Sequence, residues 1–257
     1  MKLALGVWTG LVIAFLFAPL MVVAVFSVND SMISRFPIRG VTFAWYGKLL
    51  QDDGLRDALV NSLVVAGATL VLSCSLGIVA AVGIHRCGGR LAEALRAFGL
   101  LPMMVPRLIV GIALLTFYNL VQADLSLLTV IAGHVVMTMP YVILIANARL
   151  VGFDRSLEEA AWDLGASQLT IFREILVPFL TPAIIAAALM SFTLSFDEVV
   201  VTFFTTGREN TLPMVIWSKL RFGITPELNA IATLTVIVSG LLAVIAETYL
   251  RRAQRQS

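Results

Sequence analysis

The sequence predicts an all-α, polytopic membrane protein with six transmembrane helices in a single domain over residues 1–257. Two observations predict this class. Hydrophobic residues make up 59% of the chain and charged residues 13%, with a mean hydropathy of +0.95, which is too apolar for a soluble globular domain. Apolar stretches long enough to cross a bilayer as helices also recur along the whole chain.

The predicted spans are residues 4–28, 58–84, 97–118, 125–148, 179–204 and 228–250. The first is longer than the apolar part of a signal peptide and lacks a convincing cleavage site, so we expect an uncleaved helix. The second carries small side chains at Ser73, Gly77 and Ala81, a spacing that lets two membrane helices approach closely. Pro102 and Pro106 should break the third.

The polar segment of residues 29–56 separates the first two spans. Trp45 and Tyr46 begin an amphipathic stretch there that is typical of a helix lying at the membrane interface. Trp45 is therefore either an interfacial anchor or a residue of the solute pathway.

A second amphipathic helix is predicted over residues 211–222, between the last two spans. Thr225, Pro226 and Glu227 follow it and supply a cap, a first-turn proline and a first-turn acid to the sixth span.

Basic residues orient the chain in the membrane. Arg86, Arg90 and Arg96 crowd the short loop of residues 85–96, which places that loop on the cytoplasmic side. With six spans, both termini and residues 151–178 are then cytoplasmic as well.

The composition offers no catalytic or metal site. Cys74 lies in a span and Cys87 in a basic loop, so neither suits a disulfide or a metal centre, and we expect no cofactor. His134 stands alone in an apolar helix, where a packed and hydrogen-bonded role is expected. The sequence contains no phosphate-binding loop ending in Lys-Ser or Lys-Thr, so the chain has no ATPase site of that type.

Residues 157–182 are the longest stretch that membrane insertion does not explain. A first helix is expected around Glu158, Glu159, Ala160 and Ala161, a bend at Gly165, and a second helical piece over residues 167–177 before the proline at 178. Apolar side chains share one face of the first helix and acidic side chains the other, which predicts a compact amphipathic knob outside the bilayer.

The spacing of Glu159-Ala160-Ala161, Gly165, Ile175 and Pro178 resembles the EAA loop of bacterial ABC-importer permeases. Val177 departs mildly from the leucine usual in that pattern. The resemblance implies the type I importer permease fold, with residues 151–178 as a cytoplasmic loop that docks on an ATPase. The coupling residues it implies are Glu158, Glu159, Ala160, Ala161, Gly165, Ile175 and Pro178.

A more specific resemblance covers most of the chain. Residues 191–201, 211–213 and 223–234 are similar to the second permease of spermidine/putrescine importers. This implies a polyamine or a related small amine-bearing solute, which Asp197 or Glu198 would attract by charge. The other interpretation of these acids is pairing with a neighbouring subunit or with backbone donors.

Arg107 departs from that family, whose members commonly have an acid directly after this proline. Its guanidinium could neutralise Asp197 or Glu198, or hold the carboxylate or phosphonate of a zwitterionic solute. γ-Aminobutyrate, an opine or an aminophosphonate therefore stays open as the substrate.

The expected partners follow from the same resemblance. They are two ABC ATPase subunits, a second related permease in a heterodimer, and a periplasmic or lipid-anchored solute-binding protein, all at the bacterial inner membrane, with no nucleic acid. A secondary transporter is the competing class, but it usually has inverted repeats and more spans.

Overall fold

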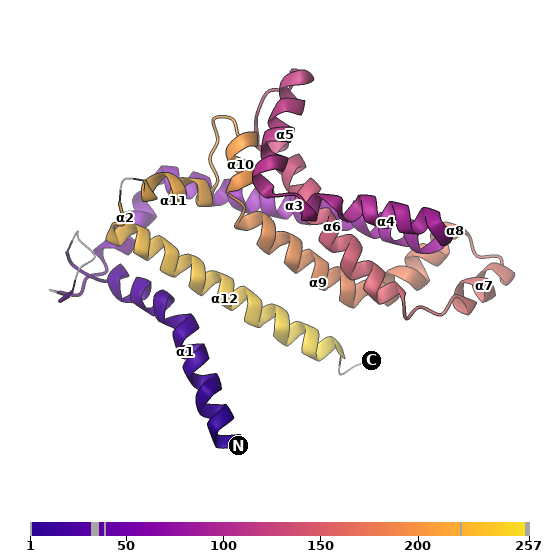
Figure 1. Cartoon of the computed structure of the whole chain (residues 1–257), viewed down its shortest axis with the longest axis horizontal. Coiled ribbons are helices and arrows are strands. Elements are labelled where there is room, and N and C mark those ends of the chain that lie inside the picture. Colours follow the sequence, from indigo (N-terminus) through magenta and orange to yellow (C-terminus); the bar gives the residue numbers. More distant parts are fainter. Residues whose placement is uncertain (1, 32–35, 39, 222, 255–257) are drawn as a thin grey trace. The chain divides into compact units, whose positions relative to one another are not determined.

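The computed structural model describes residues 2–31, 36–38, 40–221 and 223–254 (Figure 1). Side chains of residues 3, 4, 239 and those beyond 241 fall outside this description. Helices are the regular secondary structure of the described residues, whose only β contact is an isolated bridge between Asn29 and Val41. The chain forms two compact units, one of Met1–Asp57 with Val215–Ser257 and one of Ala58–Met214.

Three helices make up most of the first unit. They are α1 (Lys2–Ser27), α2 (Ala44–Gln51) and α12 (Pro226–Gln254), and both α1 and α2 pack on α12. The predicted cap of the sixth span is confirmed, because α12 begins at Pro226 and Thr225 Oγ1 accepts the Leu228 N–H at 3.4 Å. The predicted amphipathic helix is α11 (Leu212–Leu220), which joins the two units.

The second unit contains the remaining helices. They are most of α3 (Asp53–Cys87), then α4 (Gly89–Met104), α5 (Arg107–Leu120), α6 (Leu127–Leu150), α7 (Ser156–Asp163), α8 (Gln168–Ile171), the π-helical turn η1 (Phe172–Leu176), α9 (Val177–Phe196) and α10 (Val200–Thr205). Helix α6 packs against α4, α9 and α10, and α5 packs against α10. In this unit α7 and α8 lie at the opposite end of α6 and α9 from α5 and α10 (Figure 1).

Close helix contact occurs where the sequence predicted it. Ser73 and Ala81 are fully buried, and a Cβ at Gly77 would lie 2.8 Å from the Val142 side chain on α6. The Ser73 and Thr138 hydroxyls are 2.6 Å apart across the same contact. The small-residue stripe therefore brings α3 and α6 together, as predicted.

Several predicted boundaries were wrong. The third predicted span begins before residue 97, since the helical pair α4–α5 runs from Gly89 to Leu120. It is broken at Pro106 as predicted, where α4 and α5 meet with a bend of 101°, but Pro102 lies inside α4 without breaking it. The expected loop of residues 85–96 is mostly helical and turns only at Gly88 and Gly89, both at positive φ. These glycines allow the tight reversal that ordinary residues disfavour.

The fifth predicted span also differs. It starts earlier and stops earlier than residues 179–204, since one helical run extends over Gln168–Phe196 and the chain then breaks before α10. Pro178 does not end a helix as predicted. The π turn before it, in which Val177 N–H donates to Phe172 O, absorbs the missing proline donor.

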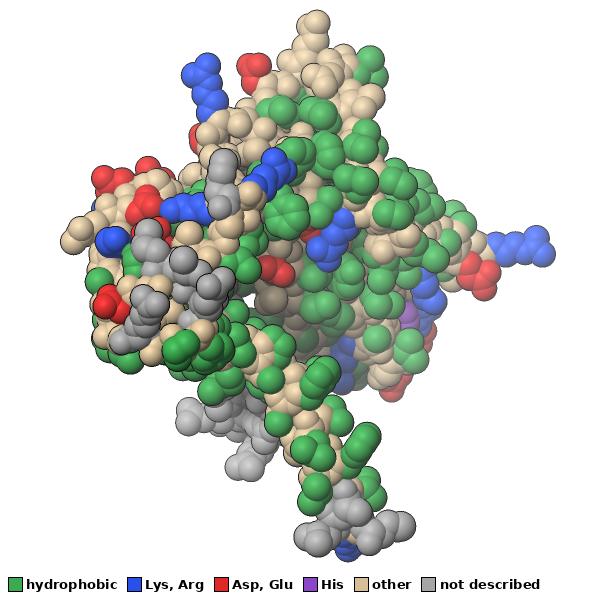
Figure 2. Space-filling view, turned by 60° about the vertical axis from the view of Figure 1, so that its left-hand side comes forward, with side chains coloured by type: hydrophobic (Ala, Val, Ile, Leu, Met, Phe, Trp, Pro, Cys, Tyr) green, Lys and Arg blue, Asp and Glu red, His purple; other side chains and the backbone are tan. Residues whose placement is uncertain are grey.

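Four helices of the described chain are long and apolar enough to cross a membrane, or five with the bent α4–α5 pair counted as one. The sixth predicted span lies in α12, whose apolar part is described only over Pro226–Val238. The space-filling view shows hydrophobic side chains over much of the visible surface, with charged side chains scattered among them (Figure 2). The protein is therefore an all-helical, multi-pass membrane protein.

Candidate functional site

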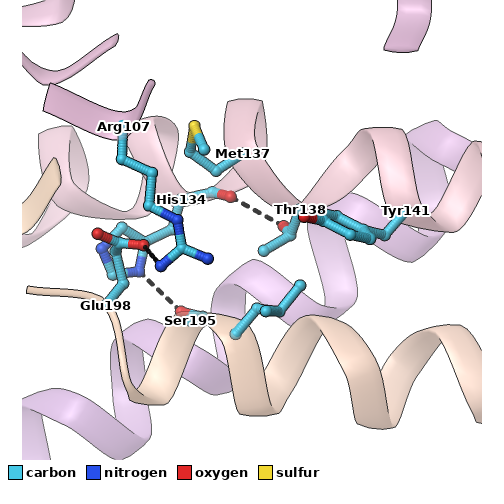
Figure 3. Close-up of a pocket in the computed structure, with 8 residues that line it drawn as sticks. Arg107, His134, Met137, Thr138, Tyr141, Ser195 and Glu198 are labelled. Carbon is cyan, nitrogen blue, oxygen red and sulfur yellow. Dashed lines mark hydrogen bonds and ion pairs between the residues drawn. The ribbon is translucent and has the colours of Figure 1, made fainter. Parts of the chain in front are cut away.

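An ion pair joins the two helix breaks of the second unit. Arg107 is the first residue of α5, directly after the bend, and Glu198 lies between α9 and α10. Their side chains meet with Arg107 Nη1 at 2.8 Å from Glu198 Oε2 (Figure 3). Sequence reasoning had placed the two residues close to one pathway, but the break at residues 197–199 was not predicted.

Glu198 is anchored on both carboxylate oxygens. Its Oε1 accepts the Val200 and Val201 amides at 2.9 and 3.0 Å, so that it caps the first turn of α10. Its Oε2 holds Arg107, and the side chain is only 4% exposed. A buried charge is tolerated when it is paired and hydrogen-bonded in this way.

Asp197 is placed differently from its neighbour. It is exposed at the C-terminal end of α9, and its carboxylate has no hydrogen bond or ion pair to the described residues. Of the two acids proposed from sequence, only Asp197 is accessible.

His134 connects α6 to both sides of the same break. Its Nδ1 is 2.8 Å from Ser195 Oγ on α9, and its Nε2 is 2.8 Å from Thr202 Oγ1 on α10. Thr202 already donates its single hydroxyl proton to Glu198 O, so Nε2 must donate to Thr202. In the neutral ring, Nδ1 then accepts from Ser195. The predicted packed and hydrogen-bonded role of His134 is confirmed.

A small recess opens beside this network. It is lined by residues of α5, α6 and α9 and of the break after α9, namely Arg107, His134, Met137, Thr138, Tyr141, Leu194, Ser195 and Glu198 (Figure 3). Broken helices with polar groups at membrane depth are common where transporters bind solutes, because irregular backbone there must line a cavity or be buried in protein. The recess is therefore the candidate solute site.

Trp45 belongs to the first unit, on α2. Its side chain is 6% exposed and its indole N–H donates to Asn29 O at 2.8 Å. This burial favours the anchoring interpretation of Trp45 over direct contact with a solute.

The stretch with EAA-like spacing forms the predicted helix, bend and helix. α7 covers Ser156–Asp163, Gly165 adopts φ +82°, and the next helical run starts at Gln168. Ile175 lies in η1 and Pro178 in the first turn of α9. The bend at Gly165 needs the left-handed backbone that glycine adopts readily.

The acidic side chains of α7 do not share one outer face. Glu158 is buried, and both its oxygens accept from Arg86 Nη2 on α3, at 3.1 and 3.2 Å, while Glu159 is exposed. Arg155 also donates to His85 O at 2.6 Å. α7 is thus held to the end of α3 by its polar side, which sequence periodicity could not show because Arg86 is 72 residues away.

The same stretch also exposes several large apolar side chains. Leu157, Trp162, Leu164 and Leu169 are 51%, 47%, 90% and 64% exposed. Large apolar side chains that are exposed outside the spans are candidates for contact with another protein.

Comparisons with known proteins agree with this architecture. Residues 73–256 match the family described as "Binding-protein-dependent transport system inner membrane component". The chain is 37% identical to the putrescine transport system permease protein PotI of Escherichia coli K12, over 94% of this chain and 89% of PotI. It is 35% identical to the spermidine/putrescine transport system permease protein PotC of the same strain, over 98% and 95% of the two chains.

Solved structures share the fold at low sequence identity. A chain of a bacterial ABC transporter involved in alginate import superposes with a TM-score of 0.75 at 15% identity, covering 98% of this chain and 96% of that one. A chain of the MetNI methionine ABC transporter gives a TM-score of 0.62 at 18% identity, covering 82% and 99%. The chain therefore belongs to the family of binding-protein-dependent transport system inner membrane components, as a permease subunit of an ABC importer.

Proposed function

We propose that this permease forms half of the translocation pathway for a polyamine or a related small amine-bearing solute. The observation that carries the proposal is the similarity to PotI and PotC over nearly the whole chain. Relatives with those names transport putrescine and spermidine, and the same solute class suits an accessible acid next in sequence to Glu198 of the recess.

Asp197 is the residue we assign to the ammonium group. Its exposed carboxylate sits one residue from Glu198, whose Cα is about 3.8 Å away, at a break in the α9–α10 run. A carboxylate at membrane depth attracts a cation more strongly than it would in water, because the surroundings screen it less.

Residues 151–178 serve as the coupling loop of the permease in this proposal. The exposed apolar side chains of this stretch, together with Glu159, would dock into a groove of an ATPase subunit. The ion pair between Glu158 and Arg86 would hold α7 against the end of α3 when the ATPase subunit moves. Gln168–Phe196 is one helical run of 29 residues, about 43 Å long, which leads from the loop to the break beside the recess.

The proposed complex contains two ATPase subunits, this chain, a second related permease and a solute-binding protein outside. Closing of the ATPase subunits on ATP would pull the loops together and move the long helical run, which exposes the recess alternately to each side. We place the complex in the bacterial inner membrane with both termini of this chain in the cytoplasm.

The test is uptake of labelled putrescine and spermidine into cells that express the complete importer. We expect uptake to need the ATPase subunit, and Asp197→Asn to lower it about 10- to 100-fold, as loss of a charge-assisted hydrogen bond of about 1.5–3 kcal/mol implies. Asp124→Asn, an exposed acid of the α5–α6 connection, is the matched control and should change nothing. Uptake by this chain alone, driven by an ion gradient, would instead establish a secondary transporter.

A further inference from the structure

The acid inside the recess is closed to solute. Glu198 has two backbone amides on Oε1 and the guanidinium on Oε2, and 4% of its side chain is exposed. An ammonium group could reach this carboxylate only by displacing Arg107 or unwinding the first turn of α10. The negative charge of Glu198 therefore holds the fold rather than the solute.

The Arg107 side chain is accessible to a solute, whereas that of Glu198 is not. Its side chain is 45% exposed, and only Nη1 has a partner among the described residues. A guanidinium carries five N–H donors, so the Nε and Nη2 edge that grips a carboxylate with two parallel bonds is free. The accessible groups of the recess are thus N–H donors of a guanidinium whose charge Glu198 already balances.

The other polar groups of the recess point to the same ligand. Thr138 donates to His134 O and contacts Ser73, and Ser195 is bonded to His134, so these hydroxyls are already used. Tyr141 lines the recess with a hydroxyl that has no partner in the described chain. A guanidinium and a phenol are the two groups left to bind a solute, and together they offer donors to an anion.

We propose that Arg107 recognises an anionic group of the solute, so that the transported molecule carries a carboxylate as well as an amine. The inference rests on the proposed function, because it assigns the second end of the same amine-bearing solute. A solute with ammonium groups at both ends would place one of them against the free N–H groups of Arg107, and two sets of donors cannot hydrogen-bond each other.

The experiment compares three four-carbon solutes that differ only in their end groups: putrescine, γ-aminobutyrate and succinate. Uptake of each is measured in cells that express the complete importer, with this chain as wild type, as Arg107→Lys, or as the double variant Arg107→Gln with Glu198→Gln. The double variant keeps the recess neutral and leaves an amide oxygen for the α10 cap. Because the solute-binding protein is the same throughout, a changed ratio of uptake rates reports the permease.

We expect the wild type to take up γ-aminobutyrate in preference to putrescine, and the double variant to lower that ratio at least about tenfold. Arg107→Lys should lower it less, because it keeps the charge but loses the two-bond grip. Arg208→Gln, an exposed arginine of the connection after α10, should leave the ratio unchanged. If the double variant does not assemble, the ratio in Arg107→Lys decides.

The remaining outcomes separate the inference from the proposed function. Uptake of putrescine alone would overturn the role of Arg107, and so would a ratio of γ-aminobutyrate to putrescine uptake that does not change with substitutions at position 107. Either result would remain compatible with transport of an amine. Succinate uptake that depends on Arg107 would support the role of Arg107 in binding an anionic group, and it would overturn the proposal that the solute carries an amine. Uptake of none of the three would overturn both.

Discussion

Single residues in this permease take roles that their chemistry alone does not reveal. Glu198 has the charge expected of a cation ligand, yet it caps α10 and neutralises Arg107. Pairing with Arg107 and with backbone donors were both among the alternatives that the sequence left open. The position of the cap was not predictable, because the apolar residues Val199 to Val201 continue the pattern of a span and hide the break. The partners are also 91 positions apart. What charge and composition did predict is that Arg107 and Glu198 belong to one polar neighbourhood.

His134 gives a prediction at this scale. His134→Leu removes the bridge between Ser195 and Thr202, and it leaves buried hydroxyls with fewer partners. We expect the free energy of unfolding to fall by about 1–3 kcal/mol, measured by denaturant titration in detergent. Met137→Leu, a conservative apolar change on the same helix, should cost under about 1.5 kcal/mol. Equal losses from the two variants would show that the bridge contributes nothing.

At the scale of elements, residue spacing predicted helix contacts, turns and caps, but it predicted poorly where the helices are interrupted. The close contact of α3 and α6, the bend at Gly165 and the start of α12 follow from local rules for small residues, glycine and helix caps. Pro106 likewise marks the bend between α4 and α5, but the break after α9 depends on distant packing instead. At Gly111, for example, an added Cβ would lie 2.5 Å from the Phe204 ring on α10.

The bend of the coupling loop is tested at Gly165. This residue has φ +82°, and a Cβ there would meet no atom within 4 Å, so backbone strain rather than crowding opposes substitution. Gly165→Val should cost about 1–3 kcal/mol of strain and reduce ATP-dependent uptake, while Gly165→Asn should retain it, because asparagine tolerates this conformation. Co-purification of the ATPase subunit shows whether the loop still docks. Normal uptake by Gly165→Val would remove the bend from the coupling mechanism.

The start of α3 gives a pH-dependent prediction. The pKa of Asp52 lies below its ordinary value of 3.8, chiefly because its carboxylate accepts the Leu55 amide, and Lys219 lowers it further. A lowered folded-state pKa contributes stability that is present above pH 3.8 and is lost as the pH falls through the folded value.

Asp52→Ala should therefore destabilise the protein at neutral pH by about 1 kcal/mol, the usual value of such a cap. The difference from wild type should shrink as the pH is lowered below 4, followed by urea unfolding across that range. Lys219→Ala should have a smaller effect, because that ion pair is exposed. A difference that stayed constant with pH would exclude the carboxylate as its source.

At the scale of the whole molecule, the orientation in the membrane is the claim to test. The basic residues around Cys87 predict that this end of α3 lies in the cytoplasm, and Cys87 is exposed while Cys74 is buried in α3. A membrane-impermeant maleimide should label the protein in inside-out vesicles and not in intact spheroplasts, and Cys87→Ser should abolish the labelling. Labelling of intact spheroplasts would reverse the orientation of both termini.

Sequence alone predicted the class of the whole molecule well, since an excess of apolar residues has few physical solutions other than membrane helices. The number of spans was harder to predict. A bent pair such as α4–α5 has the composition of one span, and only its geometry shows that it is two helices.

The exposed apolar side chains around α7 and α8 affect the cellular abundance of this protein. Leu164, at 90% exposure, and its neighbours resemble the surfaces that chaperones and proteases recognise on unassembled subunits. Docking of the proposed ATPase would hide them. Surplus permease made without its partner would then be degraded first, and the abundance of this subunit would follow that of the ATPase without any matched control of synthesis.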